Sequence, residues 1–161
     1  MATVERLVAA PRDAVVAVLS DPRSFDGIVV GSKRIRWFDA RWPEPGSRIH
    51  HSVGFTVLHI RDATTVVADE LPDRLHLRAG LGPLGSADVV FALADDGDRT
   101  RVRMTEHAAS GPLAAVWSPP LEAAMAARNR LALRRLEDLA VDRAEVRRRA
   151  ASGIPAAAGP G

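Results

Sequence analysis

Six strand-like segments follow one another between Lys33 and Ala108, and they constrain the fold more than any other feature of the sequence. Each alternates apolar or β-branched residues with polar ones, and short turn sequences such as PEPG, LPD, GLGPLG and ADDGD separate them. Strands joined by such short connections run antiparallel. The segments that predict this antiparallel meander are KRIRWFDARW, SRIHHSVGF, VLHIRDATTVVADE, RLHLRAG, SADVVFAL and TRVRMTEHA.

Shorter elements flank the meander. The alternating residues 3–10, TVERLVAA, predict a first strand, and Pro11 stands where a short helix would begin. Asp21-Pro22 offers an N-cap and a first-turn proline for a second short helix. After the meander, Pro119-Pro120 interrupt a helical pattern that is then continuous from about Leu121 to Val141. At ~1.5 Å per residue this helix would be roughly 30 Å long, enough to cross a small domain.

The length and composition are those of one soluble globular domain. The chain has 161 residues, of which 47% are hydrophobic and 26% charged, with no apolar run near the ~20 residues that a membrane span needs. Its beginning, MATVERLVAAPRD, carries Glu5 and lacks the apolar stretch of a signal peptide, so we expect a cytoplasmic protein. Cysteine is absent, which excludes disulfides, thiolate metal ligands and cysteine nucleophiles.

The basic character of the chain comes from arginine. The net charge is only +2 and Lys33 is the sole lysine, so the pI of 10.2 reflects the high pKa of arginine side chains. Nucleic-acid binding needs a contiguous cationic patch, and we expect no nucleic-acid partner. We expect a folded domain over residues 1–142 and a frayed, basic tail over residues 143–161, rich in Ala, Gly and Pro. Monomer and homodimer are both compatible with the sequence.

Alternation along the strands predicts which side chains point inward. In SRIHHSVGF, the face that must meet the core carries three apolar side chains and one histidine, namely Ile49, His51, Val53 and Phe55. Neighbouring residues on a strand point to opposite faces. We therefore expect His51 to point into the protein and His50 to point toward solvent.

Two further polar residues are predicted to point inward. Glu106 shares the apolar face of the last strand segment with Val102 and Met104, and a carboxylate is rarely buried without a partner. The apolar stripe of the long helix passes through Asn129, the only asparagine in the chain. An apolar interior with a few convergent polar groups is typical of a small-molecule site. A single buried polar group is nevertheless more often a hydrogen-bonded core residue than a ligand contact.

Two motifs that suggest cofactor or metal binding do not fit their context. GLGPLG, residues 80–85, matches G-x-G-x-x-G, but a strand follows it, so no helix N-terminus is there to bind a pyrophosphate. The segment predicts a hairpin turn. His50-His51 and Glu106-His107 are adjacent on strands, so the side chains of each pair diverge and cannot chelate one metal ion. We expect neither a metal nor a cofactor.

The order of the elements resembles the helix-grip fold of the START and birch-pollen-allergen-like superfamily (SRPBCC), close to its bacterial polyketide cyclase/dehydrase branch. The resemblance covers roughly Thr3 to Asp142 and implies an α+β domain. In that fold a seven-stranded antiparallel sheet curls around a long C-terminal helix, two short helices follow the first strand, and a cavity lies between sheet and helix. The segments that carry the resemblance are APRDAVVAVLSDP, WPEPGSRIHHSVG, LPDRLHLRA, RTRVRMTE and AARNRLALRRLEDLA.

The resemblance and the inward faces together imply that the cavity binds a hydrophobic small molecule of lipid, polyketide or isoprenoid type. The entrance is expected near residues 25–37. One alternative is a cyclase/dehydratase-type enzyme, with His51 and Glu106 as its catalytic acid-base pair. A protein-interaction or regulatory module is a further alternative, for which the basic tail is the only support. The residues predicted to line the cavity are His51, Phe55, Val66, Leu77, Phe91, Met104, Glu106, Met125 and Asn129.

Overall fold

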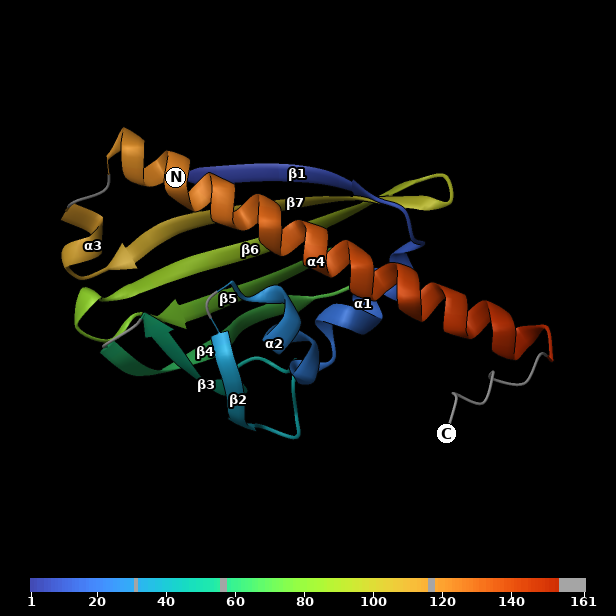
Figure 1. The fold of residues 1–161 in the computed structure, drawn as a ribbon, viewed down its shortest axis with the longest axis horizontal. Coiled ribbons are helices and arrows are strands. Elements are labelled where there is room, and N and C mark those ends of the chain that lie inside the picture. Colours follow the sequence, from blue (N-terminus) through green and yellow to red (C-terminus); the bar gives the residue numbers. More distant parts are fainter. Residues whose placement is uncertain (31, 56–57, 116–117, 154–161) are drawn as a thin grey trace.

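The seven strands of the protein form one antiparallel sheet in the order β1-β7-β6-β5-β4-β3-β2 (Figure 1). The structure, a computed structural model, describes residues 1–30, 32–55, 58–115 and 118–153, without the side chains of residues 32–34, 51–55, 58–62 and 113. This sheet confirms the predicted fold class. The strands are β1 (Ala2–Val8), β2 (Ser32–Phe38), β3 (Arg48–Phe55), β4 (Leu58–Glu70), β5 (Arg74–Gly80), β6 (Ser86–Asp96) and β7 (Arg99–Ser110).

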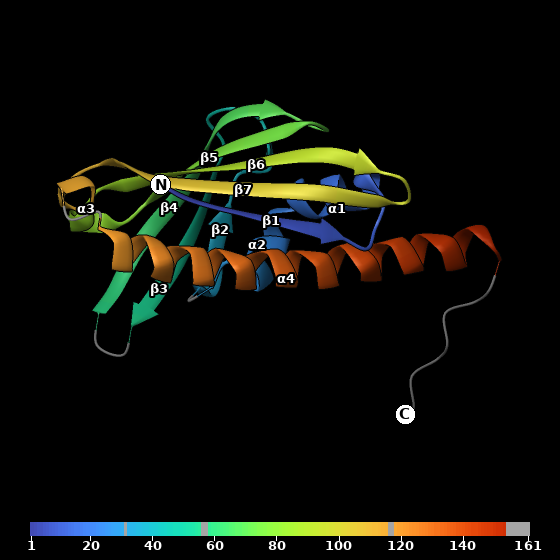
Figure 2. The same ribbon diagram turned by 90° about the horizontal axis from the view of Figure 1, so that it is seen from above.

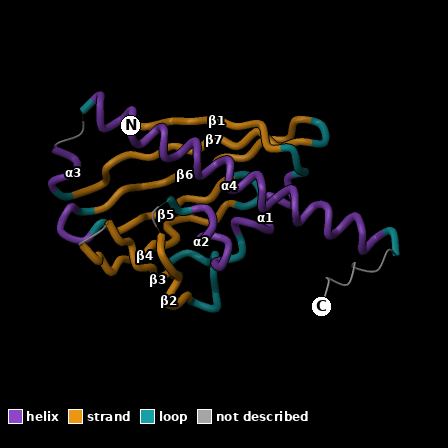
Figure 3. Tube along the Cα trace, viewed as in Figure 1, coloured by secondary structure: helices purple, strands orange, loops and turns teal. Residues whose placement is uncertain are grey.

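The long helix and the two short helices after β1 lie over one face of the sheet, and the short helix after β7 lies at its end (Figure 3). Two short helices follow the first strand as predicted, and Asp21 caps the 3₁₀ turn before the second by accepting a hydrogen bond from the Arg23 backbone N–H. Seen from above, α4 runs along the sheet, and strands β3 and β4 bend toward the side of the sheet on which α4 lies (Figure 2). The helical segments are α1 (Arg12–Leu19), η1 (Pro22–Ser24), α2 (Phe25–Ile28), η2 (Gly82–Leu84), α3 (Pro112–Ala115) and α4 (Pro119–Ala151).

The long helix differs from the prediction at both ends. It begins at Pro119, because Pro119 and Pro120 occupy its first turn, where a missing backbone N–H costs no hydrogen bond. It ends at Ala151 and not at Val141. The boundary predicted after Asp142 therefore falls within the residue range of α4.

The extension of α4 has a physical cause, because its residues pack against the start of the chain. Ala144 is buried, and the Arg143 guanidinium donates to Asp21 Oδ2 at 2.6 Å, to Ser24 Oγ at 2.8 Å and to the carbonyl oxygen of Ala17. Arg147 donates to Asp13 at 2.7 Å. These contacts hold the last turns of α4 against α1 and η1.

The core lies between the concave face of the sheet, α1 and one stripe of α4. The buried positions of α4 recur at helical spacing, so that one face of the helix meets the sheet. Every second residue of β7 is buried in the same region, from Thr100 to Glu106. The buried residues of the α4 stripe are Asn129, Ala132, Leu133, Leu136, Ala140 and Ala144.

Two glycines allow the β5–β6 connection to touch the end of β7. GLGPLG folds into η2 between two antiparallel strands, which confirms the predicted turn. Gly85 has a φ of +106°, and a Cβ placed on it would lie 2.0 Å from the Ser110 carbonyl oxygen. A Cβ on Gly111 would lie 2.5 Å from the Gly85 Cα. The two segments approach this closely only because both residues lack a side chain.

Candidate ligand pocket

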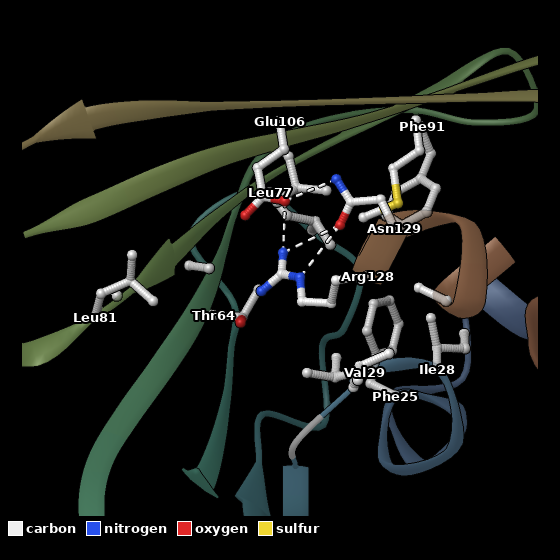
Figure 4. Close-up of a pocket in the computed structure, with 16 residues that line it drawn as sticks. Phe25, Ile28, Val29, Thr64, Leu77, Leu81, Phe91, Glu106, Arg128 and Asn129 are labelled. Carbon is white, nitrogen blue, oxygen red and sulfur yellow. Dashed lines mark hydrogen bonds and ion pairs between the residues drawn. The ribbon is translucent and has the colours of Figure 1, made fainter. Parts of the chain in front are cut away.

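A pocket of about 120 Å³ lies between the concave face of the sheet, α4 and α2 (Figure 4). The sheet contributes side chains from β4 to β7, and α2 with the two residues after it closes one side. Most of the lining is apolar. Its polar side chains are Glu106 on β7, Arg128 and Asn129 on α4, and Thr64 on β4. The lining residues are Phe25, Ile28, Val29, Val30, Thr64, Leu77, Ala79, Gly80, Leu81, Val89, Phe91, Met104, Glu106, Arg128, Asn129 and Ala132.

The structure brings part of the predicted lining together. Five predicted residues line this pocket, namely Leu77, Phe91, Met104, Glu106 and Asn129. Val66 is buried in the core, and Met125 is half-buried one helical turn before Asn129; neither is part of the lining. The side chains of His51 and Phe55 lie outside the described residues. The role of all of these residues in ligand binding stays a prediction.

Glu106 is the acidic centre of the pocket. The alternation of β7 places it on the concave face, where the residue is only 4% exposed. Its Oε2 accepts a hydrogen bond from Arg128 Nη2 at 2.5 Å and another from Asn129 Nδ2 at 2.8 Å. A buried carboxylate thus has both a cationic and an amide partner, as its burial requires.

Asn129 connects the two charged residues. It is fully buried, and its Oδ1 accepts from Arg128 Nε at 3.3 Å and from Arg128 Nη2 at 3.2 Å. Because Nδ2 donates to Glu106, the amide uses both of its ends within one cluster. We call these three residues, Glu106, Arg128 and Asn129, the polar cluster.

Arg128 is the member of the polar cluster that the sequence prediction missed. It precedes Asn129, so its Cα lies at the edge of the buried stripe, and only its long side chain brings the guanidinium to the carboxylate. A signal was present, because Arg128 stands one helical turn before Ala132, which is on the stripe. A buried glutamate also indicates a cationic side chain nearby, because an unpaired buried carboxylate is energetically costly.

The α2 side of the pocket lies in the region where the sequence predicts the entrance, and the position of the entrance itself stays a prediction. Phe25, Ile28 and Val29 belong to the lining and to the expected region around residues 25–37. Trp42 supports them from behind, since its ring meets Phe25 edge-on at 5.2 Å and its Nε1 donates to the Leu19 carbonyl oxygen at 3.1 Å.

The catalytic pair predicted from the sequence, His51 and Glu106, can be located only by its strands, because the described residues do not include the side chain of His51. On the backbone of β3, His51 pairs with Ile35 of β2 and with Asp62 of β4. Glu106 lies on β7, and three strands, β4, β5 and β6, separate β7 from β3 in the sheet. The reach between His51 and Glu106, on which the enzyme alternative depends, therefore stays a prediction.

The opposite face of the sheet carries arginines that are paired with acids. Arg103 donates to Glu5, and Arg101 donates to Glu5 and to Asp96. Hydrogen bonds from Arg101 and then Arg103 are the main reason that the pKa of Glu5 is lowered. Glu5 and Asp96 therefore largely neutralise the positive charge of Arg101 and Arg103 on this face.

A second cluster on that face surrounds Asp88. Arg78 donates to Asp88 through Nε at 2.7 Å and through Nη2 at 2.9 Å, and these hydrogen bonds lower the pKa of the buried carboxyl group. His76 and His107 approach the same carboxylate with their Nε2 atoms at 3.4 Å and 3.8 Å. Strand alternation predicts His76 on the solvated face, but its side chain is only 20% exposed because it lies beside Asp88.

Comparisons with known proteins give the fold. Neither a protein-family model nor a curated protein sequence matches the chain. Solved structures do match: a protein from Arthrobacter aurescens at 17% identity and a TM-score of 0.66, over 87% of this chain and 85% of that one. CalU16 from Micromonospora echinospora matches at 16% identity and a TM-score of 0.58, over 94% and 85% of the two chains.

A third solved structure is DynU16, a protein in the dynemicin biosynthetic locus. It matches at 19% identity and a TM-score of 0.62, over 85% of this chain, which corresponds to 45% of the DynU16 chain. At such identities the likeness shows a shared fold, consistent with the helix-grip fold that the sequence resembles. Among the helices of the described residues, none has the length and apolarity to cross a bilayer.

Proposed function

We propose that the protein binds a hydrophobic small molecule of lipid, polyketide or isoprenoid type in the pocket between the sheet and α4. The observation that carries this proposal is a largely apolar pocket in which Glu106, Arg128 and Asn129 form one hydrogen-bonded cluster. Apolar walls give affinity through burial of ligand surface, at about 25 cal/mol per Å². A few fixed polar groups orient the ligand.

The size of the pocket limits how much of a ligand it encloses. An apolar cavity of about 150 Å³ holds a benzene molecule, and sites for drug-sized ligands run from about 300 Å³ upward. A pocket of about 120 Å³ therefore encloses one ring or a short chain. The remainder of a larger ligand would extend past α2, which has only four residues.

One of the solved structures supports a role with small molecules. DynU16 shares the fold of this chain and belongs to a biosynthetic locus, and a biosynthetic context suits a protein that handles small molecules. This support concerns only the handling of a small molecule and not its chemical class, since the two chains are 19% identical.

Native mass spectrometry of the purified protein tests the proposal. The wild type should carry a hydrophobic adduct, or take one up from a lipid and polyketide extract. Ala79→Phe fills the pocket from β5 and should abolish the adduct, whereas Ala94→Phe, at an exposed position of β6, should retain it. A wild-type protein that carries no adduct and takes up none, or equal adducts in both variants, would contradict the proposal.

A further inference from the structure

Within the described residues, the polar cluster leaves one acceptor and one donor unused. No hydrogen bond among these residues involves Oε1 of Glu106 or Nη1 of Arg128, although the other atoms of both groups are occupied. In Figure 4 both point toward the side of the pocket where Thr64 and Leu81 lie. A ligand on that side would meet a carboxylate oxygen and a guanidinium N–H that belong to one ion pair.

The charge of the cluster restricts what that ligand can be. In the part of the chain that the structure describes, Arg128 and Glu106 are the only charged side chains of the lining, and they neutralise each other as an ion pair. A carboxylate ligand would leave the pocket with a net negative charge, and an ammonium ligand would leave it with a net positive one. Burying an uncompensated charge costs several kcal/mol, so an uncharged head group is favoured over either.

The two free atoms also specify the hydrogen bonding of the head group. Oε1 of an ionised glutamate only accepts, and Nη1 of arginine only donates. The matching head group must donate to one atom and accept from the other at adjacent positions. A primary carboxamide or a hydroxy ketone does this while remaining uncharged.

We infer that the pocket selects an apolar ring or chain that ends in an uncharged head group with adjacent hydrogen-bond donor and acceptor atoms. This inference rests on the proposed function and names the chemistry of its ligand. The polar cluster binds the head group through Glu106 Oε1 and Arg128 Nη1, while Asn129 holds Glu106 in place from behind. The apolar walls enclose the adjoining ring.

Four single-ring probes of similar size test the inference: benzamide, benzoate, benzylamine and toluene. Titrations followed by ¹⁵N–¹H correlation spectra should show benzamide binding about tenfold more tightly than toluene, the gain expected from hydrogen bonds to charged groups. Benzoate and benzylamine should bind at least about tenfold more weakly than benzamide, because each adds a buried charge. Tight binding of benzoate or benzylamine would overturn the inference.

A double variant separates the head-group contacts from the apolar walls. Glu106→Gln with Arg128→Met removes both charges together, so that neither remains buried alone. Benzamide should then lose its advantage over toluene, while the affinity for toluene should change little. The matched control is Glu5→Gln with Arg103→Met, which removes an ion pair on the opposite face and should leave all four affinities unchanged. Thermal melts verify that both variants fold.

The outcomes distinguish the inference from the proposed function. Equal binding of benzamide and toluene overturns the inference and leaves the proposed apolar pocket intact. Binding of none of the four probes also overturns the inference, and native mass spectrometry of the same sample then decides the proposed function separately. An unchanged benzamide advantage in the double variant would likewise overturn the inference.

Discussion

Asn129 donates a hydrogen bond from Nδ2 to Oε2 of Glu106 at 2.8 Å, and both residues are buried between α4 and β7. This bond joins the long helix to the sheet at the polar side of the pocket. It also gives the Glu106 carboxylate a partner that remains in place if Arg128 turns toward a ligand.

Replacing Asn129 should therefore destabilise the protein. Asn129→Leu keeps the number and branching of the side-chain heavy atoms but removes the donor to a buried carboxylate, and we expect a loss of about 1–3 kcal/mol in the free energy of unfolding. Urea denaturation measures it. Arg130→Ala, at an exposed position of the same helix, is the control and should change stability little. An equal loss of unfolding free energy in both variants would show that the hydrogen bond from Asn129 to Glu106 does not stabilise the protein measurably.

Acid should weaken the protein through Asp88. The Arg78 hydrogen bonds lower the pKa of this carboxyl group in the folded state, so its contribution is present above the unfolded pKa of about 4 and is lost as the pH falls through the folded pKa. Asp88→Asn should cost about 1 kcal/mol near neutral pH. The difference in unfolding free energy between wild type and Asp88→Asn should shrink between about pH 5 and about pH 3.

Exposed Asp138 provides the control for that measurement. Asp138→Asn should not reproduce the change with pH. A difference between wild type and Asp88→Asn that stays constant down to about pH 3 would mean that Asp88 is not stabilised as its contacts indicate.

Arg143 should stabilise the protein although it lies beyond the predicted domain boundary. Arg143→Ala removes hydrogen bonds to Asp21, Ser24 and the Ala17 carbonyl oxygen, and we expect a loss of about 1–3 kcal/mol. In a chain of this size, each kcal/mol lowers Tm by about 2–4 °C in a calorimetric scan. Arg148→Ala, at an exposed position of the same helix, should leave Tm nearly unchanged. A Tm for Arg143→Ala equal to that of Arg148→Ala would contradict the prediction.

Gly85 should tolerate a side chain far less than another glycine with positive φ. Gly85→Ala places a Cβ 2.0 Å from the Ser110 carbonyl oxygen, so the backbone must shift, and we expect a loss above about 2 kcal/mol. Gly97 has a φ of +67°, and a Cβ added there would meet no described atom within 4 Å, so Gly97→Ala should cost only about 1 kcal/mol. Chemical denaturation of both variants makes the comparison, and similar losses would argue against the close approach.

Local sequence patterns predict the fold well, because most strands alternate apolar and polar residues and are followed by a recognisable turn sequence. Glu106 is assigned to the inner face from its position two residues after Met104, and the structure places it there. GLGPLG is identified as a turn because a strand follows it. Such features depend only on neighbouring residues.

The parts that sequence reasoning missed depend on distant residues. The last turns of α4 contact residues far away in the sequence, as Arg143 contacts Asp21, and a helical pattern alone cannot show such a contact. Arg128 joins the polar cluster through the length of its side chain, which the position of its Cα does not reveal. Met125 lies on the same helix as Asn129 but beyond the extent of the pocket, and periodicity gives no information on where a pocket ends.

The strand order has a consequence for how the chain folds. From β2 to β7 every strand pairs with its neighbour in the sequence, so these hairpins form by closing short loops. β1 instead pairs with β7, with Ala2 opposite Glu106, and α4 covers the concave face only after all strands are made. The part of the apolar face that packs against α4 is therefore covered only after all seven strands have been synthesised, and exposed apolar surface of this kind makes a partly folded chain prone to aggregation.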